Sequence, residues 1–291
     1  MKTLLEVLQS GTDYLSGKGT DSPRLMMEQL MARVLECPRL QLYLRFESPI
    51  PEDRLVRLRE GIRRLGAGEP LQYVLGDTEF MGHRFKADRR ALIPRPDTET
   101  LVNAVLACEP LARLANPAIT EVGVGSGCVI ISLALARPVA RYVAIDASSA
   151  ALELARENAA LHGRGEAIRF VQGNLLEGVA PGSLDAVVAN LPYIPTADCE
   201  KLPRHIREHE PLTALDGGGD GLVLIRQLAS QAARGITPGG RVFLEIGFDQ
   251  GSQVVELLRR NGFIETVILK DLGERDRVVM AVRQGDIHEL S

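Results

Sequence analysis

A strand-like apolar run ends in the polar tetrapeptide Asn190-Leu191-Pro192-Tyr193. The side-chain oxygen of Asn190 accepts hydrogen bonds, and so does the backbone carbonyl of Leu191, which Pro192 holds in an extended, non-helical turn. Tyr193 adds a flat aromatic face for a planar group. Two acceptors beside such a face suit a nitrogen that carries two N–H groups, as in a carboxamide or an aromatic exocyclic amine. The tetrapeptide is therefore a candidate catalytic and substrate-binding site.

The nitrogen of such a group is a poor nucleophile because its lone pair is delocalised. Acceptors aimed at both N–H groups would hold the nitrogen and favour the geometry in which the lone pair points at an electrophile. The methyl group of a sulfonium is a suitable electrophile, and positioning and electrostatics supply the catalysis without a strong general base. The competing interpretation is a simple turn at the end of a strand, with Asn190 as its cap.

A glycine-rich turn, Gly123-Val124-Gly125-Ser126-Gly127, forms a second candidate site between an expected strand and an expected helix. Glycines there allow positive φ and let the backbone come close to a ligand. About twenty residues later the next strand ends in Asp146, which is placed to accept hydrogen bonds from ribose hydroxyls. The dinucleotide fingerprint would need glycine at Cys128. The turn therefore suits a cofactor without a pyrophosphate, and S-adenosylmethionine is the usual one.

Asn174 and Leu175 follow a third expected strand. The amide of Asn174 could bind the amino group of an adenine, with Leu175 against the ring. An Asx turn at Asn174 explains the same residues equally well.

These candidate residues lie in a region where strands and helices alternate, which predicts βαβ units and a mostly parallel sheet. Because the carboxyl ends of such strands meet at one edge, Asn190 and the glycine turn should face the same crevice. We expect the last two strands to pair antiparallel, since only KDLGER separates them. The predicted strands are AITEVG, RYVAID, AIRFVQ, LDAVVAN, GRVFLEIG, FIETVIL and DRVVMAV.

The first part of the chain is predicted to be helical. Asp21 or Ser22 can cap a helix that has Pro23 in its first position and that ends before Pro38. Another helix is expected to begin at Pro51. Its arginines indicate either a solvated face or a docking surface for a partner; they are Arg54, Arg57, Arg59, Arg63 and Arg64.

The composition is that of an ordinary globular protein, with 291 residues, 45% of them hydrophobic and 25% charged. This length suits one large domain and one small one. The net charge of −4 gives no overall attraction to nucleic acid or to an anionic membrane. Four widely spaced cysteines argue against zinc and disulfides, and no signal peptide is expected. His205 and His209 lack the glutamate of a metalloprotease motif, so we expect no metal site.

Several longer segments, in this order, make the chain resemble the HemK/PrmC-type methyltransferases, which methylate the side-chain amide of a glutamine in peptide chain release factors. IPRPDTE and EPLTALDGG are the most specific of them. The segments are GEPLQYVLGDTEFMGHRF, LIPRPDTETLV, GVGSG, NLPYIP, EPLTALDGGGDGL and DLGERDRVVMA.

The resemblance implies an α/β fold of the class I methyltransferase type, with a seven-stranded, mostly parallel sheet and an N-terminal helical domain. It implies a helical substrate-docking domain at 1–78, a β-hairpin linker at 79–96 and an S-adenosylmethionine-dependent methyltransferase domain at 97–291. Residues 94–98 would wall the cleft. The partner would be a release factor in the cytoplasm, and we expect a monomer without nucleic-acid or membrane partners.

The resemblance also implies residue roles. Residues 123–127, Asp146, Asn174, Leu175 and Asn190 would hold S-adenosylmethionine, and Glu121 would keep a carboxylate near its amino group. Residues 190–193 would bind the glutamine of a Gly-Gly-Gln tripeptide, whose methylation modulates translation termination.

Two segments depart from the family pattern. Glu121-Val122 stands where the family usually has Asp-Leu, and Leu191 stands where it has proline. The sequence Asn-Leu-Pro-Tyr is familiar from ribosomal RNA adenine N6-methyltransferases, which remain an alternative. Such enzymes should carry a basic surface, and this chain is acidic overall. A ribosomal-protein glutamine methyltransferase, which would share the chemistry, and a non-catalytic S-adenosylmethionine-binding or protein-docking module are further alternatives.

Overall fold

The computed structural model describes residues 2–285 and divides the chain into two compact units. One unit contains the chain up to Asp77 together with Pro203–His209. The other begins at Thr78, runs to Leu202 and resumes at Glu210. The domain boundaries at residues 78 and 96 stay predictions, because compactness alone does not show which segments fold independently.

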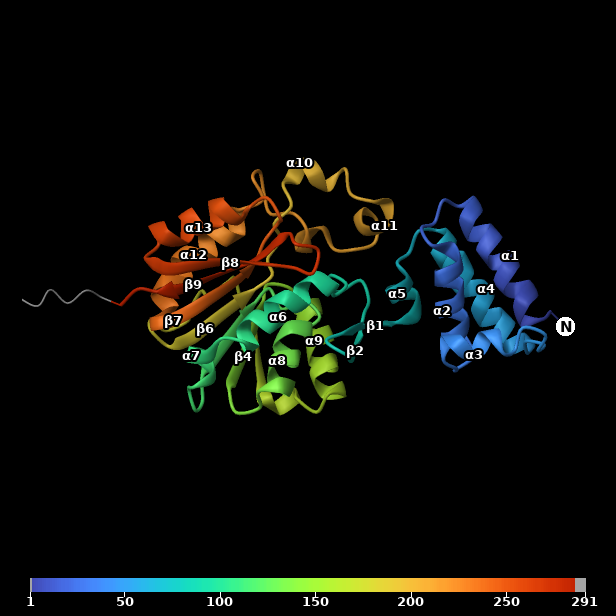
Figure 1. Ribbon diagram of the computed structural model, residues 1–291, viewed down its shortest axis with the longest axis horizontal. Helices are drawn as coiled ribbons and strands as arrows, with labels where there is room; N and C mark the ends of the chain where they lie inside the picture. The colour runs from blue at the N-terminus through green and yellow to red at the C-terminus, as the bar shows by residue number, and fades with distance from the viewer. Residues whose placement is uncertain (1, 286–291) are drawn as a thin grey trace, which may run out of the picture. The chain divides into compact units, whose positions relative to one another are not determined.

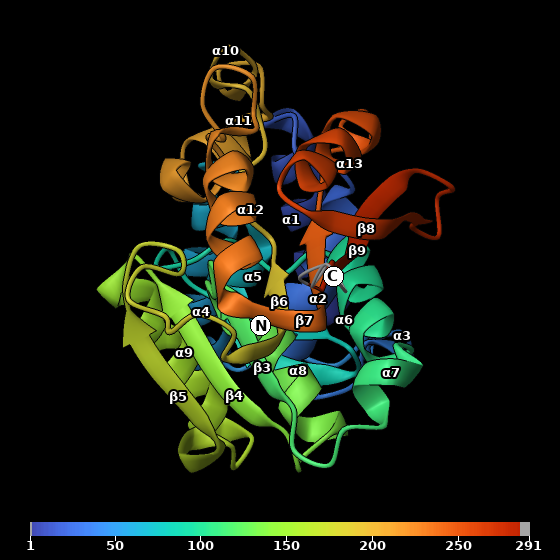
Figure 2. The ribbon, with the colours of Figure 1, turned by 90° about the vertical axis from the view of Figure 1, so that its left-hand side faces the viewer.

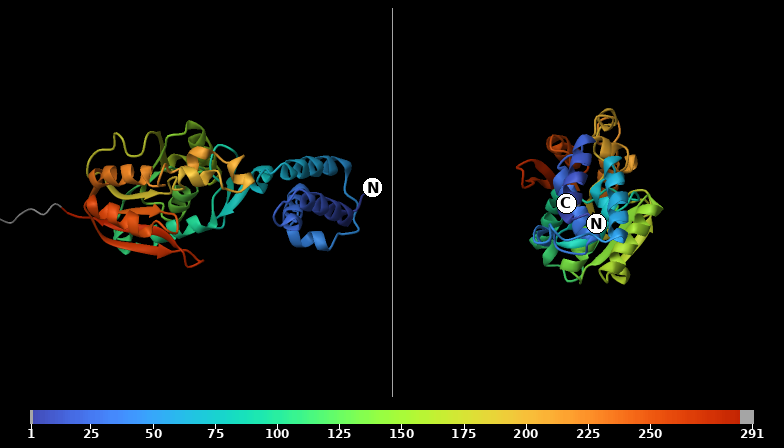
Figure 3. Two further views of the ribbon diagram at one scale, coloured as in Figure 1. Left: turned by 90° about the horizontal axis from the view of Figure 1, so that it is seen from above. Right: turned by 90° about the vertical axis from the view of Figure 1, so that its right-hand side faces the viewer.

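The first unit is a small helical assembly (Figure 3). Its helices surround one apolar core, which includes Leu8, Met27 and Leu58. A capping box starts its first helix, since Thr3 N donates to Glu6 Oε2 at 2.8 Å and Glu6 N donates to Thr3 Oγ1 at 3.3 Å. Its helices are α1 Leu4–Gly17, α2 Pro23–Val34, α3 Arg39–Tyr43, α4 Glu52–Gly66, α5 Leu71–Leu75 and the short α11 Arg204–Arg207.

The predicted start of α2 is confirmed at Pro23, but the predicted cap is wrong. Ser22 occupies the N-cap position with a φ of 49°, and its side chain makes no capping hydrogen bond. Helix α4 begins at Glu52, with Pro51 as its N-cap residue. Four of its five arginines form ion pairs within the unit, which favours a solvated, charge-paired face over a docking surface; the pairs are Arg54–Glu36, Arg59–Glu52, Arg63–Glu60 and Arg64–Glu69.

The second unit contains a seven-stranded sheet in the order β5-β4-β3-β6-β7-β9-β8 (Figure 2). All seven predicted strands are confirmed. Strands β3 to β7 are parallel to one another, and β9 is antiparallel to both β7 and β8. The strands are β3 Ala118–Val122, β4 Arg141–Asp146, β5 Ile168–Gln172, β6 Leu184–Ala189, β7 Ile236–Glu245, β8 Phe263–Lys270 and β9 Asp276–Arg283.

The chain leaves β3 toward β4 on one side and reaches β6 on the other side of β3. This reversal of strand order creates a crevice at the carboxyl ends of β3 and β6, where ligands bind in open α/β sheets. Asn190 follows β6 and the glycine turn follows β3. The topology therefore brings the two candidate sites to one place, as the sequence predicted.

Helices cover both faces of the sheet (Figure 1). The longer ones are α6 Glu99–Leu106, α8 Cys128–Ala136 and α9 Ser149–Leu161 on one face, and α12 Val223–Gly235 and α13 Gly251–Arg260 on the other. Short pieces complete the unit: α7 Glu109–Ala112, α10 Thr196–Cys199, and the 3₁₀ turns η1 Pro96–Thr98, η2 Gly165–Ala167 and η3 Leu212–Ala214.

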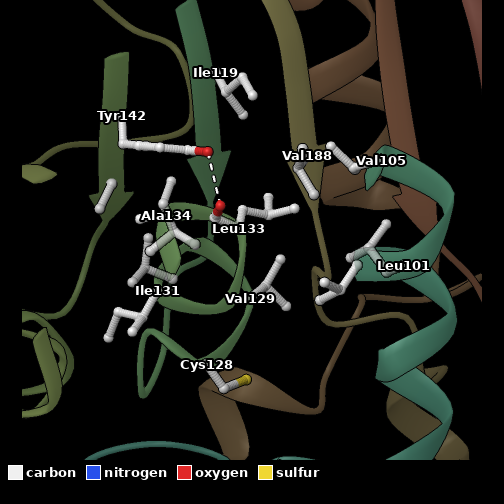
Figure 4. Packing of buried hydrophobic residues seen from close by; sticks show 14 of the residues in the cluster. Leu101, Val105, Ile119, Cys128, Val129, Ile131, Leu133, Ala134, Tyr142 and Val188 are labelled. Carbon is white, nitrogen blue, oxygen red and sulfur yellow. Dashed lines mark hydrogen bonds between the residues drawn. The ribbon is translucent and has the colours of Figure 1, made fainter. Parts of the chain in front are cut away.

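Successive residues of β6 point to opposite faces, so that Val188 joins the core under α6 and α8 while Val187 joins the core under α12. Figure 4 shows the first of these cores, in which Leu101 of α6 and Val188 face the α8 side chains. The hydroxyl of Tyr142 donates to the carbonyl of Leu133 at 2.9 Å, which satisfies the polar end of a buried ring (Figure 4). The core holds α8, and with it the glycine turn, rigidly against the sheet.

A hairpin of β1 Asp77–Phe80 and β2 His83–Lys86 precedes the sheet. Asn158 of α9 connects β2 to the glycine turn: its Oδ1 accepts from Lys86 N at 2.7 Å, and its Nδ2 donates to the carbonyl of Ser126 at 2.9 Å. Among the described residues, no helix is both long enough and apolar enough to cross a membrane.

Candidate functional site

A cavity of about 480 Å³ opens at the carboxyl ends of the parallel strands. Its wall contains the glycine turn, Asp146 and residues 173–175, and also residues 190–192. Residues 90–95, Thr98, Pro211, Thr213 and Ala214 also line it. The structure thus brings the two candidate sites predicted from the sequence into one cavity of the size typical for small-molecule ligands.

Each glycine of the turn has a positive φ, of 75° at Gly123, 55° at Gly125 and 80° at Gly127. A side chain in this region of backbone conformation is strained. A Cβ atom on Gly127 would lie 2.9 Å from Ile131 Cδ1 and 3.2 Å from Ala155 Cβ, so this glycine also allows α8 and α9 to pack closely. The backbone amide of Gly125 donates to Asp146 Oδ2 at 2.9 Å, which fixes the turn to the end of β4.

Glu121 is 2% exposed near the end of β3 and lines the cavity. Its Oε2 accepts from the backbone amide of Ile130, in the first turn of α8, at 2.8 Å. Gly127, the N-cap residue of that helix, has no side chain that could do so. Burial raises the pKa of Glu121 well above its ordinary value, the hydrogen bond from Ile130 opposes this, and the charge of Asp146 adds to it. Glu121 therefore acts as a helix cap in the wall of the cavity.

Asp146 is half-buried at the end of β4, and its Oδ1 accepts from Ser148 N at 2.8 Å. Its carboxylate keeps further lone pairs for hydroxyl groups in the cavity. Asn174 is exposed and donates from Nδ2 to Glu177 Oε1 at 2.6 Å, which leaves the Oδ1 atom of Asn174 as an acceptor. Leu175 is buried with a φ of 52°. The three side chains lie where the sequence placed them.

The electrostatics of the cavity favour a cationic ligand. Two arginines line it, but both are paired with carboxylates: Arg90 with Asp88 at 2.8 Å and Glu157 at 2.7 Å, and Arg95 with Glu210. Glu121 and Asp146 are the acidic residues of the wall, and a carboxylate attracts positive charge.

Three residues of the tetrapeptide, Asn190, Leu191 and Pro192, line the cavity. Leu191 is buried, and its Cδ2 atom approaches the glycine turn so closely that a Cβ atom on Gly123 would lie 2.9 Å away. The sequence pointed only to the backbone carbonyl of this residue. Its side chain also packs the tetrapeptide against the glycine turn.

Tyr193 is half-buried and is not among the described residues that line the cavity. Its ring packs against the core under α12, and its carbonyl accepts from Gln250 Nε2 at 2.9 Å. Burial raises the pKa of the Tyr193 phenol to about 12, and the nearby carboxyl of Glu245 contributes to the shift. The aromatic face predicted for a planar group therefore lies beside the cavity rather than in its wall.

The resemblance placed Thr98 only in the cleft wall, as part of residues 94–98. Its contact with the tetrapeptide was not predicted, and neither was any role for Glu210. Thr98 is buried, and its Oγ1 accepts from Asn190 Nδ2 at 3.2 Å. Glu210 is also buried and accepts from Ile93 N at 3.1 Å and from Arg95, so it connects the loop before α6 to the loop after α11. The signal was the two specific segments IPRPDTE and EPLTALDGG, which contain these residues.

Two glycines of LDGGGDGL, Gly217 and Gly221, lie against the tetrapeptide. The amide of Gly217 donates to the carbonyl of Ile194 at 2.8 Å, and Ile194 N donates to Leu215 O at 3.1 Å. A Cβ atom on Gly217 would lie 2.7 Å from the carbonyl oxygen of Pro192 and 2.8 Å from the Cα atom of Tyr193. Only a residue without a side chain fits there.

Comparison with known proteins identifies the family. The PrmC N-terminal domain family matches residues 6–76, and a methyltransferase domain family matches 119–209. The release factor glutamine methyltransferase of Moorella thermoacetica is 41% identical over 283 residues, which cover 97% of this chain and 99% of the relative. That of Geobacter sulfurreducens is 38% identical over 277 residues, or 95% of each chain.

The chain belongs to the release factor glutamine methyltransferase family. The resemblance seen in the sequence is thereby confirmed. A solved methyltransferase structure from Pyrococcus furiosus, 16% identical, matches with a TM-score of 0.51 and covers 81% of this chain and 100% of that one. It supports the fold alone, and with the strand order it confirms the predicted class I methyltransferase architecture.

Proposed function

We propose that this chain transfers a methyl group from S-adenosylmethionine to the side-chain amide nitrogen of the glutamine in the Gly-Gly-Gln motif of a peptide chain release factor. The observation that carries the proposal is the meeting of Asn190 and Leu191 with the glycine turn in one cavity wall. Relatives named release factor glutamine methyltransferase match nearly the whole chain, which supports this substrate.

The cavity fits S-adenosylmethionine. The positive φ values of Gly123, Gly125 and Gly127 form a cradle without side chains, and the paired arginines leave the wall suited to a cation. Asp146 would accept hydrogen bonds from the ribose, and Asn174 with Leu175 would hold the adenine. Glu121 would contribute to the wall near the amino group. When bound, the cofactor supplies a methyl group on a positively charged sulfur.

The chain's own residues position the nucleophile. Asn190 Oδ1 and the Leu191 carbonyl would accept one N–H hydrogen bond each from the target amide. The two hydrogen bonds fix the plane of the amide and direct its nitrogen into the cavity. Leu191 packs against Gly123, so that the acceptor loop and the cofactor cradle keep one relative position. Catalysis then rests on proximity and orientation, which do not require a strong base at the nitrogen.

The same acceptors would serve a glutamine of a ribosomal protein or, less directly, an adenine of ribosomal RNA. The names of the full-length relatives favour the release factor over both. We propose that the protein acts in the cytoplasm as a monomer. We also propose that it has no nucleic-acid or membrane partners, which its net charge of −4 supports. We also propose that its N-terminal helices, at residues 1–78, hold the release factor, supported by the PrmC N-terminal domain match.

The test is methyl transfer from labelled S-adenosylmethionine to a release factor, with three controls in parallel: a release factor whose target glutamine is replaced by alanine, a ribosomal protein mixture and ribosomal RNA. We expect label on the unchanged release factor alone. Asn190→Ala should abolish the transfer while cofactor binding, measured by calorimetry, persists. Label on RNA or on ribosomal protein alone would refute the proposed substrate.

A further inference from the structure

The orientation of the Asn190 carboxamide decides whether the site works. A carboxamide has an acceptor oxygen and a donor NH₂ group of nearly equal size, and a half-turn exchanges them. Only the oxygen can accept an N–H of the target amide. Asn190 Nδ2 lies 3.2 Å from Thr98 Oγ1, in the geometry of a donor to that hydroxyl. The orientation of Asn190 therefore depends on what Thr98 is able to accept.

Thr98 is 3% exposed, and its hydroxyl carries a single hydrogen. Because its oxygen accepts from Asn190, its own O–H must find another acceptor. Glu245 lies beside the pair. It ends β7, and the preceding residue, Leu244, is in register with Ala189, which precedes Asn190 in the adjacent strand.

Glu245 is 2% exposed, and its Oε2 atom has no hydrogen-bond partner among the described residues. A buried carboxylate with a free oxygen is costly, so its presence calls for an explanation. An ionised carboxylate can only accept. It therefore imposes a direction on the neighbouring hydroxyl, whose hydrogen must point toward Glu245 and whose lone pair must face Asn190.

We propose that Thr98 and Glu245 are positioning residues that hold the Asn190 carboxamide with its oxygen toward the target amide. The inference rests on the proposed function, because it assigns a direction to a hydrogen-bond acceptor of that reaction. The direction runs from Asn190 Nδ2 to the Thr98 oxygen and from the Thr98 hydroxyl to Glu245. If Thr98 loses its hydroxyl, or Glu245 can no longer accept from that hydroxyl, Asn190 is free to turn its NH₂ group toward the substrate.

Several charged groups act on Glu245, and they determine when it is ionised. Burial raises the pKa of Glu245 to about 7. Hydrogen bonding to Thr98 lowers it in part, as do the positive charge of Arg277 on β9 and hydrogen bonding to Asn190 itself, whereas the charge of Asp97 in η1 raises it. Tyr193 and Cys128 are the other titratable groups that interact with its charge. Arg277 lies 3.2 Å from Asp97 and 3.0 Å from Asp271, so its charge is shared among three carboxylates.

The consequence is a pH-dependent orientation. Above the pKa of Glu245 its carboxylate accepts a hydrogen bond from the Thr98 hydroxyl, so the Thr98 oxygen can only accept from Asn190. Below it the carboxyl can donate to Thr98, whose hydroxyl can then donate to Asn190 Oδ1 and withdraw that oxygen from the substrate. The rate of methyl transfer should therefore rise as pH increases through about 7.

The first experiment compares Thr98→Val, Thr98→Ser and the control Thr120→Val in steady-state methylation of a release factor. Thr98→Val keeps the shape and removes the hydroxyl, and it should lower kcat on the order of 100-fold, the effect of a misplaced reacting group. Affinity for S-adenosylmethionine, measured by calorimetry, should not change. Thr98→Ser restores the hydroxyl and should restore kcat. Thr120, a buried threonine of β3 outside the cavity wall, should tolerate valine.

The second experiment measures kcat against pH. The unchanged enzyme should show a rising limb near pH 7, and Glu245→Gln should lack the limb, because a carboxamide does not titrate there. Asp97→Asn should move the limb to lower pH, because it removes a charge that raises the pKa of Glu245. A purely structural role for Glu245 would move none of these readouts.

The inference is overturned if Thr98→Val retains wild-type kcat, or if Glu245→Gln keeps both the rate and the limb. Should Glu245→Gln fail to fold, the comparison of Thr98→Val with Thr98→Ser and the pH dependence of kcat in Asp97→Asn still test the inference. The proposed function fails in a different way, since in that case the unchanged enzyme itself would not methylate a release factor.

Discussion

Gly217→Ala should disable the enzyme, although Gly217 itself is not proposed to contact the substrate. Gly217 lies behind the tetrapeptide, where a Cβ atom would be 2.6 Å from the carbonyl oxygen of Gly221, 2.7 Å from that of Pro192 and 2.8 Å from Tyr193 Cα. All three neighbours are backbone atoms, which cannot rotate away as a side chain can. The backbone of the tetrapeptide must therefore move.

The size of the movement follows from these distances. Ordinary van der Waals contact of a Cβ atom begins near 3.4 Å, so the 2.7 Å approach to Pro192 has to lengthen by about 0.7 Å. The carbonyl of Leu191, one residue away, would move with it. A displacement approaching 1 Å near a reacting group costs about 100-fold in rate. That factor corresponds to about 2.7 kcal/mol of transition-state stabilisation.

The assay is single-turnover methyl transfer to a release factor, with cofactor affinity measured separately by calorimetry. Gly219→Ala is the matched control, because it lies in the same glycine run and a Cβ atom there would meet nothing within 4 Å. We expect Gly217→Ala to lose the rate and Gly219→Ala to keep it, with both variants folded. Equal rates for Gly217→Ala and the unchanged enzyme would refute the argument, and so would equal losses in both variants.

Three further substitutions test separate parts of the site. Asp146→Ala should weaken S-adenosylmethionine binding by about 1.5–3 kcal/mol in calorimetry, the typical worth of hydrogen bonds to a charged group; unchanged affinity would contradict the ribose role. Leu191→Pro keeps the acceptor carbonyl, so kcat should stay near wild type while stability to urea falls by about 2 kcal/mol from lost packing against Gly123; a large loss of rate would show that catalysis needs the leucine side chain. Glu210→Ala leaves the buried amide of Ile93 without its acceptor and should cost about 1–3 kcal/mol of unfolding free energy in the same measurement, and an unchanged urea midpoint would argue against that link.

The sequence was sufficient for the sheet because each strand has a strong local signal. An apolar run of five or six residues between helical segments predicts a strand, whichever neighbour that strand later pairs with. The position of β9 between β7 and β8 has no local signal. It depends on which edge of the sheet is free when the last two strands arrive, and this is a property of the whole fold.

The candidate site likewise contains residues that the sequence could predict and residues that it could not. Asn190 and the glycine turn were predictable because each follows a strand, and the carboxyl ends of parallel strands meet. Thr98, Glu210 and Glu245 were not predictable as a group. They come from a 3₁₀ turn, a loop and a different strand, and only the tertiary structure brings Thr98 to Asn190 and Glu210 to Ile93. The capping hydrogen bond expected at Ser22 is absent even though its local signal was strong. Serine favours N-cap positions, but Ser22 has a left-handed φ and makes no such bond.

The departure at Leu191 can now be interpreted in physical terms. Proline at this position would fix the backbone by its own ring, whereas leucine leaves the backbone dihedrals free. This chain restrains the loop in other ways: the Leu191 side chain packs against Gly123, Gly217 lies against the Pro192 carbonyl, and Gln250 Nε2 donates to the Tyr193 carbonyl at 2.9 Å. Because these contacts come from three separate segments, they hold the Leu191 carbonyl in place without the ring. A leucine here is thus compatible with methylation of a glutamine amide, and does not by itself indicate an RNA substrate.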